Sequence, residues 1–342
     1  MAELSPMMKQ YLRIKSQNED SILFFRVGDF YEMFFDDAKK ASDELDLTLT
    51  GKDCGMGERA PMCGVPYHSC ESYIARLVQK GYKVAICEQT EDPKTAKKLV
   101  DRDIIRVITP GTVIEDMMLE EGKNNYLAAV ALTGDGVGLC FTDASTGECH
   151  LTSFPAGNYN SAVSDELLRF APREILVAES FKAKSAALWD FLQGNFKAGI
   201  TVRKEEAFEP QKTEELFVKH FGISELEERG IDKASSKAAA LGAVIDYLYE
   251  TGRTGSISVN KIDVYTDSQF MRLDMTALRN LELTETLRGR EKKGTLLWAL
   301  DKTGTSMGKR LLRSWLEQPL VDPAAINRRL DAVECLYKDT VA

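Results

Sequence analysis

Two hydrophobic runs on either side of Gly28-Asp29 predict a β-hairpin close to the start of the chain. The runs span residues 22–27 and 30–34 and are rich in aromatic and branched side chains. A two-residue turn that contains glycine, placed between such runs, is typical of a tight hairpin. Side chains alternate between the two faces of a strand, so we expect Phe30 and Glu32 to share one face. The opposite, core-facing side is then expected to hold Tyr31, Met33 and Phe35.

The placement of Phe30 and Glu32 on one face allows two interpretations. In the first, the ring stacks on a nucleobase and the carboxylate forms a hydrogen bond with that base. In the second, Phe30 belongs to the core and Glu32 is an ordinary solvated acid. Taken alone, these residue types favour the second interpretation, because aromatic rings are usually buried and acids usually exposed.

The first 110 residues predict a mixed α/β domain. Apolar residues at helical spacing predict a helix over 5–17. The segment 61–68 contains two prolines and a glycine and predicts turns, with Ser69 as the cap of the helix that follows. The other expected elements are helices over 38–45 and 70–80, strands over 47–50, 82–88 and 104–109, and a glycine-rich loop over 51–57.

Residues 124–250 predict a second α/β domain, in which strands come first and helices later. Three strand candidates separated by glycine-containing turns predict an antiparallel meander over 125–132, 136–143 and 148–154. Residues 111–123 and 251–260 are expected to be linkers on either side. The remaining elements are helices over 161–170, 185–191, 213–221 and 233–250, and strands over 174–178 and 201–203.

From residue 261 onward the pattern predicts helices only. They are expected over 275–287, 295–302, 306–316 and 324–337. The last helix has no glycine cap, and we expect the chain to be a piece of a longer protein whose all-α domain begins here. The expected fold class is therefore a multidomain α/β protein that ends in the start of a helical domain.

The charge distribution indicates which parts of the chain suit nucleic acid. The net charge is −9, which is unusual for a nucleic-acid-binding protein. Residues 111–250 hold 13 Lys+Arg against 23 Asp+Glu, whereas residues 1–110 hold 16 against 18 and residues 251–342 hold 15 against 12. Because DNA phosphates attract cations, we expect the acidic middle third to lie away from a DNA backbone.

Cysteine usage and hydropathy bear on the compartment. No apolar run reaches the length of a membrane span, and the N-terminus lacks a secretory signal. Seven cysteines are scattered without a CxxC spacing, which predicts reduced thiols in a cytoplasmic protein and no metal site.

Two segments look like catalytic motifs but fail on their chemistry. The segment 304–310 has three residues between its glycines where a phosphate loop needs four, and Arg310 stands where that loop needs Ser or Thr. Asp143, at a strand end, could serve a ribonuclease-H-like nuclease, but two-metal chemistry needs several convergent carboxylates. A turn role beside Ser-Thr-Gly is the better interpretation of Asp143. We expect no catalytic residue, and keep the nuclease as the alternative function.

Several motifs, in the same order along almost the whole chain, resemble the bacterial MutS family of DNA mismatch repair proteins. The segment 28–34, with Phe30-Tyr31-Glu32, resembles the Phe-x-Glu mismatch-recognition motif of that family. Residues 279–283 and 305–316 resemble the start of its lever region. The other matching segments are 37–41, 61–68, 84–89 and 106–112.

The resemblance implies three domains and a set of DNA contacts. It implies a mismatch-recognition domain over 1–110, a ribonuclease-H-like connector over 124–250 and the truncated start of a core and lever domain over 261–342. Phe30 is expected to wedge into the minor groove and stack on the mispaired base, and Glu32 to form a hydrogen bond with that base. Lys52 and Arg102 match family positions that face DNA near the mismatch.

The resemblance also implies what the family does beyond this segment. Family proteins bind ATP and Mg²⁺ in a later domain and act as dimers through it, so we expect no enzyme activity and no cofactor in this chain. The expected partners are mismatched double-stranded DNA and a MutL-type repair protein at the connector or core, with a cytoplasmic, nucleoid-associated location and no membrane. A protein-interaction scaffold without DNA binding is a further alternative.

Overall fold

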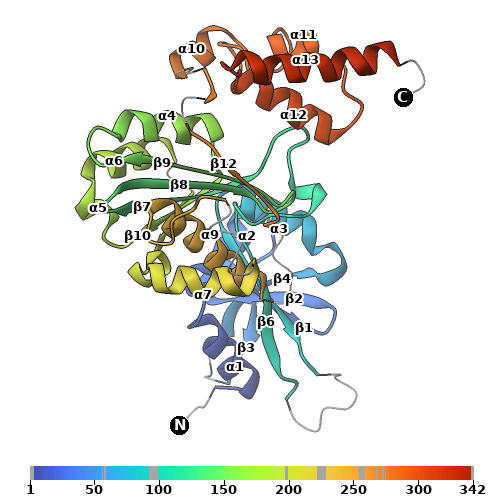
Figure 1. Ribbon diagram of the computed structural model, residues 1–342. Helices are drawn as coiled ribbons and strands as arrows, with labels where there is room; N and C mark the ends of the chain where they lie inside the picture. The colour runs from blue at the N-terminus through green and yellow to red at the C-terminus, as the bar shows by residue number, and fades with distance from the viewer. Residues whose placement is uncertain are drawn as a thin grey trace.

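Three parts follow one another in the structure, a computed structural model: an N-terminal sheet, a second sheet and a group of C-terminal helices (Figure 1). The structure describes residues 4–55, 57, 59–91, 99–196, 199–221, 229–253, 259–266, 269–271, 273 and 275–339. The expected multidomain α/β class, ending in helices, is confirmed. No helix in these ranges combines the length and the apolar character needed to cross a bilayer.

The N-terminal sheet has six strands in the order β3-β4-β2-β1-β5-β6. Neighbouring strands are antiparallel except β1 and β5, which are parallel. Helices α2 and α3 cover one face, where Phe24, Tyr31 and Met33 are buried, and α1 covers the other. The strands are β1 Ser21–Val27, β2 Phe30–Phe34, β3 Thr50–Asp53, β4 Arg59–Pro66, β5 Lys83–Gln89 and β6 Arg102–Ile108, and the helices are α1 Pro6–Lys15, α2 Phe35–Leu45, the 3₁₀ turn η1 Tyr67–Ser69 and α3 Cys70–Gln79.

The prediction of turns over residues 61–68 is wrong, because most of this segment forms β4. Cys63 and Val65 are buried and pair with Met33 and Tyr31 of β2, so burial on one face stabilises a strand despite its prolines. The strand predicted over 47–50 begins only at Thr50 and continues into the predicted glycine-rich loop. The preceding residues are largely exposed and make no strand.

Two local predictions next to these strands are also wrong. Ser69 precedes α3, but its hydroxyl donates to the Pro66 carbonyl at 3.4 Å and caps no amide of the helix. Phe35 does not continue β2. It is the first residue of α2, with φ +53°, and packs with Phe34 on the α1 side of the sheet, away from Tyr31.

The second sheet has the order β11-β10-β7-β8-β9-β12. The predicted meander of β7, β8 and β9 is antiparallel, and β10 and β11 run parallel to β7, the arrangement of a ribonuclease-H-like domain. Helices α7 and α9 cover one face, and α4 and α6 the other. The strands are β7 Tyr126–Thr133, β8 Gly136–Asp143, β9 Glu148–Pro155, β10 Glu174–Ala178, β11 Ile200–Arg203 and β12 Lys261–Val264, and the helices are α4 Asn160–Phe170, α5 Phe181–Lys184, α6 Ala186–Asn195, α7 Pro210–His220 and α9 Ser236–Gly252.

Strand β12 differs from the predicted division of the chain. Residues 261–264 were expected to open the helical domain, but they lie parallel to β9 and complete the second sheet.

The packing of α9 against β8 depends on Gly138, because a Cβ there would lie 2.0 Å from the Ser236 carbonyl oxygen. Only glycine therefore lets the start of α9 approach β8 this closely.

A buried carboxylate joins the end of the first sheet to the second. Glu174 of β10 is 1% exposed, and four donors from three segments surround its carboxylate. Thr109 and the Gly111 amide, just after β6, donate to one oxygen. Thr201 and Tyr247 donate to the other, at 2.6 and 2.7 Å. The segment between the two sheets is thereby fixed to the core of the second.

The C-terminal helices are α10 Met275–Asn280, α11 Leu296–Leu300, α12 Ser306–Glu317 and α13 Pro323–Lys338. The helix predicted over 275–287 thus ends at Asn280. Thr305 caps α12 by accepting from the Gly308 amide at 3.1 Å, so the segment 304–310 is a helix start, as its failed phosphate-loop pattern suggested.

Candidate nucleic-acid interface

The β1–β2 hairpin presents an aromatic ring at its tip. Gly28 has φ +58°, a conformation that glycine adopts at little cost, and the turn brings Val27 opposite Phe30. The ring of Phe30 is 48% exposed, whereas its neighbour Tyr31 is 5% exposed. Burying a phenylalanine is normally favourable, so an exposed ring next to a tight turn is a candidate for contact with a ligand.

Glu32 and Lys52 lie on the same side of the sheet as this ring. Glu32 is two residues along β2 from Phe30 and pairs across the ladders with Phe25 and Gly64. Strand β3 places the Lys52 ammonium 2.5 Å from a carboxylate oxygen of Glu32, and the Glu32 side chain is 14% exposed. The hairpin therefore holds a ring beside an ion pair, as the alternation of residues in β2 predicted for Phe30 and Glu32.

Arg102, the fourth predicted contact, does not lie on this surface. Arg102 is buried, and its guanidinium donates to the Arg26 carbonyl at 2.7 Å and to the Gln10 side chain at 3.0 Å. It also lies 4.9 Å from the centroid of the Phe25 ring. Burial lowers the pKa of Arg102. Arg102 thus links α1 and β1 beneath the surface, and its contact with DNA stays a prediction.

The sequence interpretation missed the residues that lie behind the turn. Tyr67 is exposed, and the Arg26 guanidinium lies 3.7 Å from its ring centroid. Glu88 of β5 accepts from both Arg26 and Tyr31. The signal available in the sequence was the segment Pro66-Tyr67-His68, but its partners come from strands far apart in the chain.

Asp143 has the role of a turn residue. It is fully buried at the end of β8, and one oxygen accepts from the amide and hydroxyl of Ser145 at 2.9 and 2.6 Å. The other oxygen accepts from the Asn125 amide at 3.1 Å and lies 4.0 Å from Arg310. Within the described residues, no three His, Cys, Asp or Glu side chains are grouped so that they could hold a metal ion.

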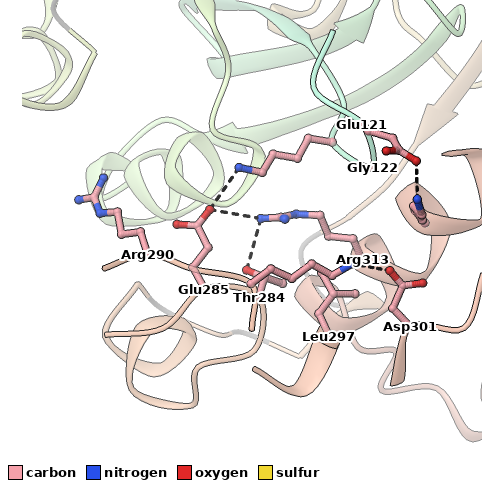
Figure 2. Close-up of a pocket in the computed structure, with 11 residues that line it drawn as sticks. Glu121, Gly122, Thr284, Glu285, Arg290, Leu297, Asp301 and Arg313 are labelled. Atoms are coloured by element: carbon pink, nitrogen blue, oxygen red, sulfur yellow. Dashed lines mark hydrogen bonds and ion pairs between the residues drawn. The ribbon is translucent and has the colours of Figure 1, made fainter. Parts of the chain in front are cut away.

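Several basic residues of the C-terminal part form ion pairs with acids. A cavity of about 340 Å³ lies between the segment 121–123 and these helices. Figure 2 shows Glu285 and Arg313 facing each other in this cavity. The distance between their charged groups is 3.9 Å, and the Lys123 ammonium lies 3.3 Å from the same carboxylate. Lys309 pairs with Glu121, and Lys292 with Asp301 at 2.5 Å. The pairs Lys123–Glu285 and Lys309–Glu121 join the segment 121–123 to the C-terminal part of the protein.

Comparison with protein families gives three consecutive matches along the chain. Residues 5–117 match the family model described as MutS domain I, residues 125–263 match MutS domain II and residues 276–342 match MutS domain III. The second match extends into β12, in agreement with the place of this strand in the second sheet.

Curated bacterial proteins named DNA mismatch repair protein MutS are similar over the whole chain. The protein of Ruminiclostridium cellulolyticum is 48% identical over 334 residues, which are 98% of this chain and 38% of the relative. That of Acetivibrio thermocellus is 49% identical over 333 residues, or 97% of this chain and 38% of the relative. That of Alkaliphilus oremlandii is 46% identical over 342 residues, or 99% of this chain and 39% of the relative. The chain thus spans under two fifths of their length.

Proposed function

Because this chain belongs to the MutS family of DNA mismatch repair proteins, we propose that its N-terminal sheet recognises mispaired or unpaired bases in duplex DNA. The observation that supports this most directly is the exposed ring of Phe30 on a tight turn, beside the Glu32–Lys52 ion pair. A single ring of this kind suits insertion between base pairs. The chain reads no fixed sequence in this proposal; it senses how easily a step of the duplex is disturbed.

The proposed discrimination has a physical basis in DNA deformability. An apolar wedge in the minor groove unstacks one base step and kinks the duplex, at a cost of a few kcal/mol. A mismatch has weaker pairing, so the same insertion costs less there. Phe30 is the wedge in this scheme, and the difference in cost between the two duplexes becomes the difference in affinity.

Glu32 and Lys52 have complementary proposed roles. Glu32 lies next to the wedge and forms a hydrogen bond with the displaced base. A carboxylate near DNA phosphates is repelled unless it is protonated or paired, and Lys52 supplies the opposite charge within 2.5 Å. Lys52 is 30% exposed at its side chain, which leaves its ammonium able to contact a phosphate as well. Arg102 supports β1 from below.

For a protein of the relatives' full length, we propose a role in DNA mismatch repair. ATP and Mg²⁺ would bind in a domain beyond the three matched here, and dimerisation would depend on that domain. A MutL-type partner would contact the second domain or the helices. The acidic charge of the second domain suits a protein better than DNA. We propose no catalytic role for the residues of this chain, and a cytoplasmic location with the nucleoid.

The test is a binding titration of the Phe30→Ala variant against the wild-type chain. The probes are two duplexes of equal length, one fully matched and one with a single G·T mismatch. We expect Phe30→Ala to lose most of the preference for the mismatch, because the matched duplex gains little from the wedge. Val202→Ala, which shortens an exposed side chain in β11, is the control and should keep the preference. Equal loss on both duplexes, or no loss, would contradict the wedge.

A further inference from the structure

The two carbonyl groups of the hairpin turn are both held from behind. Arg26 Nε donates to the Gly28 carbonyl at 2.5 Å. The backbone amide of Tyr67 donates to the Asp29 carbonyl at 3.0 Å. Both bonds involve the two residues that directly precede Phe30, so they fix the backbone from which its ring projects.

The Arg26 guanidinium is itself fixed on two further sides. One of its terminal nitrogens donates to Glu88 at 3.2 Å, and its carbon lies 3.7 Å from the Tyr67 ring centroid, in the geometry of a cation–π contact. Glu88 also accepts from the Tyr31 hydroxyl. Burial and the bond with Glu88 raise the pKa of Tyr31, so this hydroxyl keeps its proton and remains a donor.

Arg26 lies on the opposite face of the hairpin from the ring. It pairs across the ladder with Tyr31, whereas Phe30 pairs with Val27, and cross-strand partners share a face. The Arg26 side chain is only 16% exposed. Its charge is engaged by Glu88 and Tyr67, so a direct phosphate contact does not account for its position.

We propose that Arg26 is a positioning residue that clamps the Gly28-Asp29 turn from behind and thereby sets the preference for mismatched over matched DNA. This inference rests on the proposed function of Phe30. A wedge separates base pairs only if its backbone resists being pushed back, and a preformed turn avoids the entropy cost of ordering on binding. Tyr67 completes the clamp, because its amide holds Asp29 while its ring supports the guanidinium.

The clamp requires the chemistry of arginine and not positive charge alone. A planar guanidinium can donate from its edge to Gly28 and Glu88 and still present its face to Tyr67. A lysine ammonium carries the same charge but has no flat face and no fixed fork. The Arg26→Lys variant therefore distinguishes the two roles of Arg26: it keeps the positive charge that would attract DNA but loses the geometry of the clamp.

The first experiment uses no DNA. Hydrogen exchange of the full chain, followed by mass spectrometry, reports the protection of amides in residues 27–31. We expect Arg26→Lys and Tyr67→Leu to speed this exchange about fivefold, the effect of losing roughly one hydrogen bond. Tyr67→Phe keeps the ring and the amide and should behave as wild type. Arg13→Lys, an exposed change on α1, is the matched control. A urea unfolding curve for each variant establishes that it folds.

The second experiment measures affinity for the matched and the G·T duplexes of the same length. We expect Arg26→Lys to lower the ratio of mismatched to matched affinity about fivefold, whereas Tyr67→Phe should keep the wild-type ratio. 2-Aminopurine beside the mismatch gives the spectroscopic readout, because its fluorescence rises when the step is unstacked. A weaker rise with Arg26→Lys at saturating protein supports a wedge that is poorly held.

The outcomes separate the two proposals. Unchanged exchange in Arg26→Lys overturns the clamp. Faster exchange with an unchanged affinity ratio, in a protein whose ratio falls with Phe30→Ala, overturns the effect on specificity and leaves the proposed function intact. If Phe30→Ala leaves the ratio unchanged, the proposed function fails, and with it the role of Arg26 in recognition, whatever the exchange data give.

Discussion

The ammonium of Lys52 lies 2.5 Å from a carboxylate oxygen of Glu32. The two residues come from β3 and β2, strands that do not touch in the sheet order because β4 lies between them. Gly64 of β4 lies opposite Glu32 and carries no side chain into this space. The pair is thus a bridge across a strand, and a duplex that approaches the hairpin meets an ion pair beside the ring.

Removal of the Lys52 charge should weaken the binding of matched and mismatched DNA equally. If Lys52 contacts a phosphate, Lys52→Met should lower the affinity for matched and mismatched duplexes alike and reduce the slope of log affinity against log salt by about 1. Fluorescence anisotropy titrations between low and moderate salt measure that slope. Lys182→Met, which removes an exposed cation from the second domain, should leave it unchanged. A slope equal to that of wild type in Lys52→Met would rule out a phosphate contact.

Substitution of the paired acid should have the opposite effect on matched DNA. Glu32→Gln removes a negative charge near the phosphates and releases Lys52, so we expect tighter binding to the matched duplex. The preference for the mismatch should fall, because Gln places a different hydrogen-bonding group beside the base. The same titrations give both values. An unchanged matched affinity would show that the charge of Glu32 is not felt by the duplex.

The buried carboxylate of Glu174 should be important for stability. Glu174→Ala removes the acceptor of four donors in a site that is 1% exposed, and of these Thr109 has a second partner in the Thr112 hydroxyl. One unsatisfied buried group costs about 1–3 kcal/mol, so we expect a loss of at least about 3 kcal/mol in the free energy of unfolding. Urea denaturation followed by circular dichroism measures it. Glu179→Ala, an exposed acid just after β10, should change stability by less than about 0.5 kcal/mol.

Stability should fall in alkaline solution through Tyr247. Burial, and then the negative charge of Glu174, raise the pKa of this hydroxyl well above its ordinary value. Above pH 10 the unfolded chain releases the proton and the folded chain keeps it, so the unfolded state gains stability as the pH rises. The expected slope is about 1.4 kcal/mol per pH unit for one tyrosine. Tyr247→Phe should lack this contribution when unfolding is measured between pH 9.5 and 11, and an identical pH profile in both proteins would contradict it.

The ion pairs between the segment 121–123 and the helices should depend on salt. Lys123 and Glu285 are 3.3 Å apart, with side chains 40% and 39% exposed, so their coupling is expected to be below about 1 kcal/mol. Lys123→Glu should reduce hydrogen-exchange protection in residues 282–313, and adding Glu285→Lys should restore part of it. Raising the salt concentration should shrink the difference between these variants. If the double variant is no better protected than Lys123→Glu alone, the pair makes no contribution.

The elements that the sequence predicted best are those stabilised by their own pattern. The β1–β2 hairpin and the β7–β9 meander follow directly from hydrophobic runs separated by glycine turns. The shared side of Phe30 and Glu32 follows from the two-residue period of β2. In each of these cases the information lies within a few neighbouring residues.

The elements that the sequence did not predict depend on partners distant in the chain. Strand β4 has proline and glycine, and only its position between β2 and β3 makes it a strand. Strand β12 is four residues long and pairs with β9, more than a hundred residues earlier. In the sequence Arg102 looks like any basic residue, but in the fold it is buried and bonded to Gln10 of α1. Local propensity does not predict such contacts, because they depend on the packing of residues that are distant in the chain.

The pairing of β12 with β9 has a practical consequence for anyone who expresses the second domain by itself. A fragment that stops at the end of α9 would leave the backbone amides and carbonyls of Glu148–Leu151 without their parallel neighbour. Bare sheet edges of this kind recruit strands from other molecules and promote aggregation. Recombinant boundaries that extend to residue 266 should therefore give monomeric material where shorter ones precipitate.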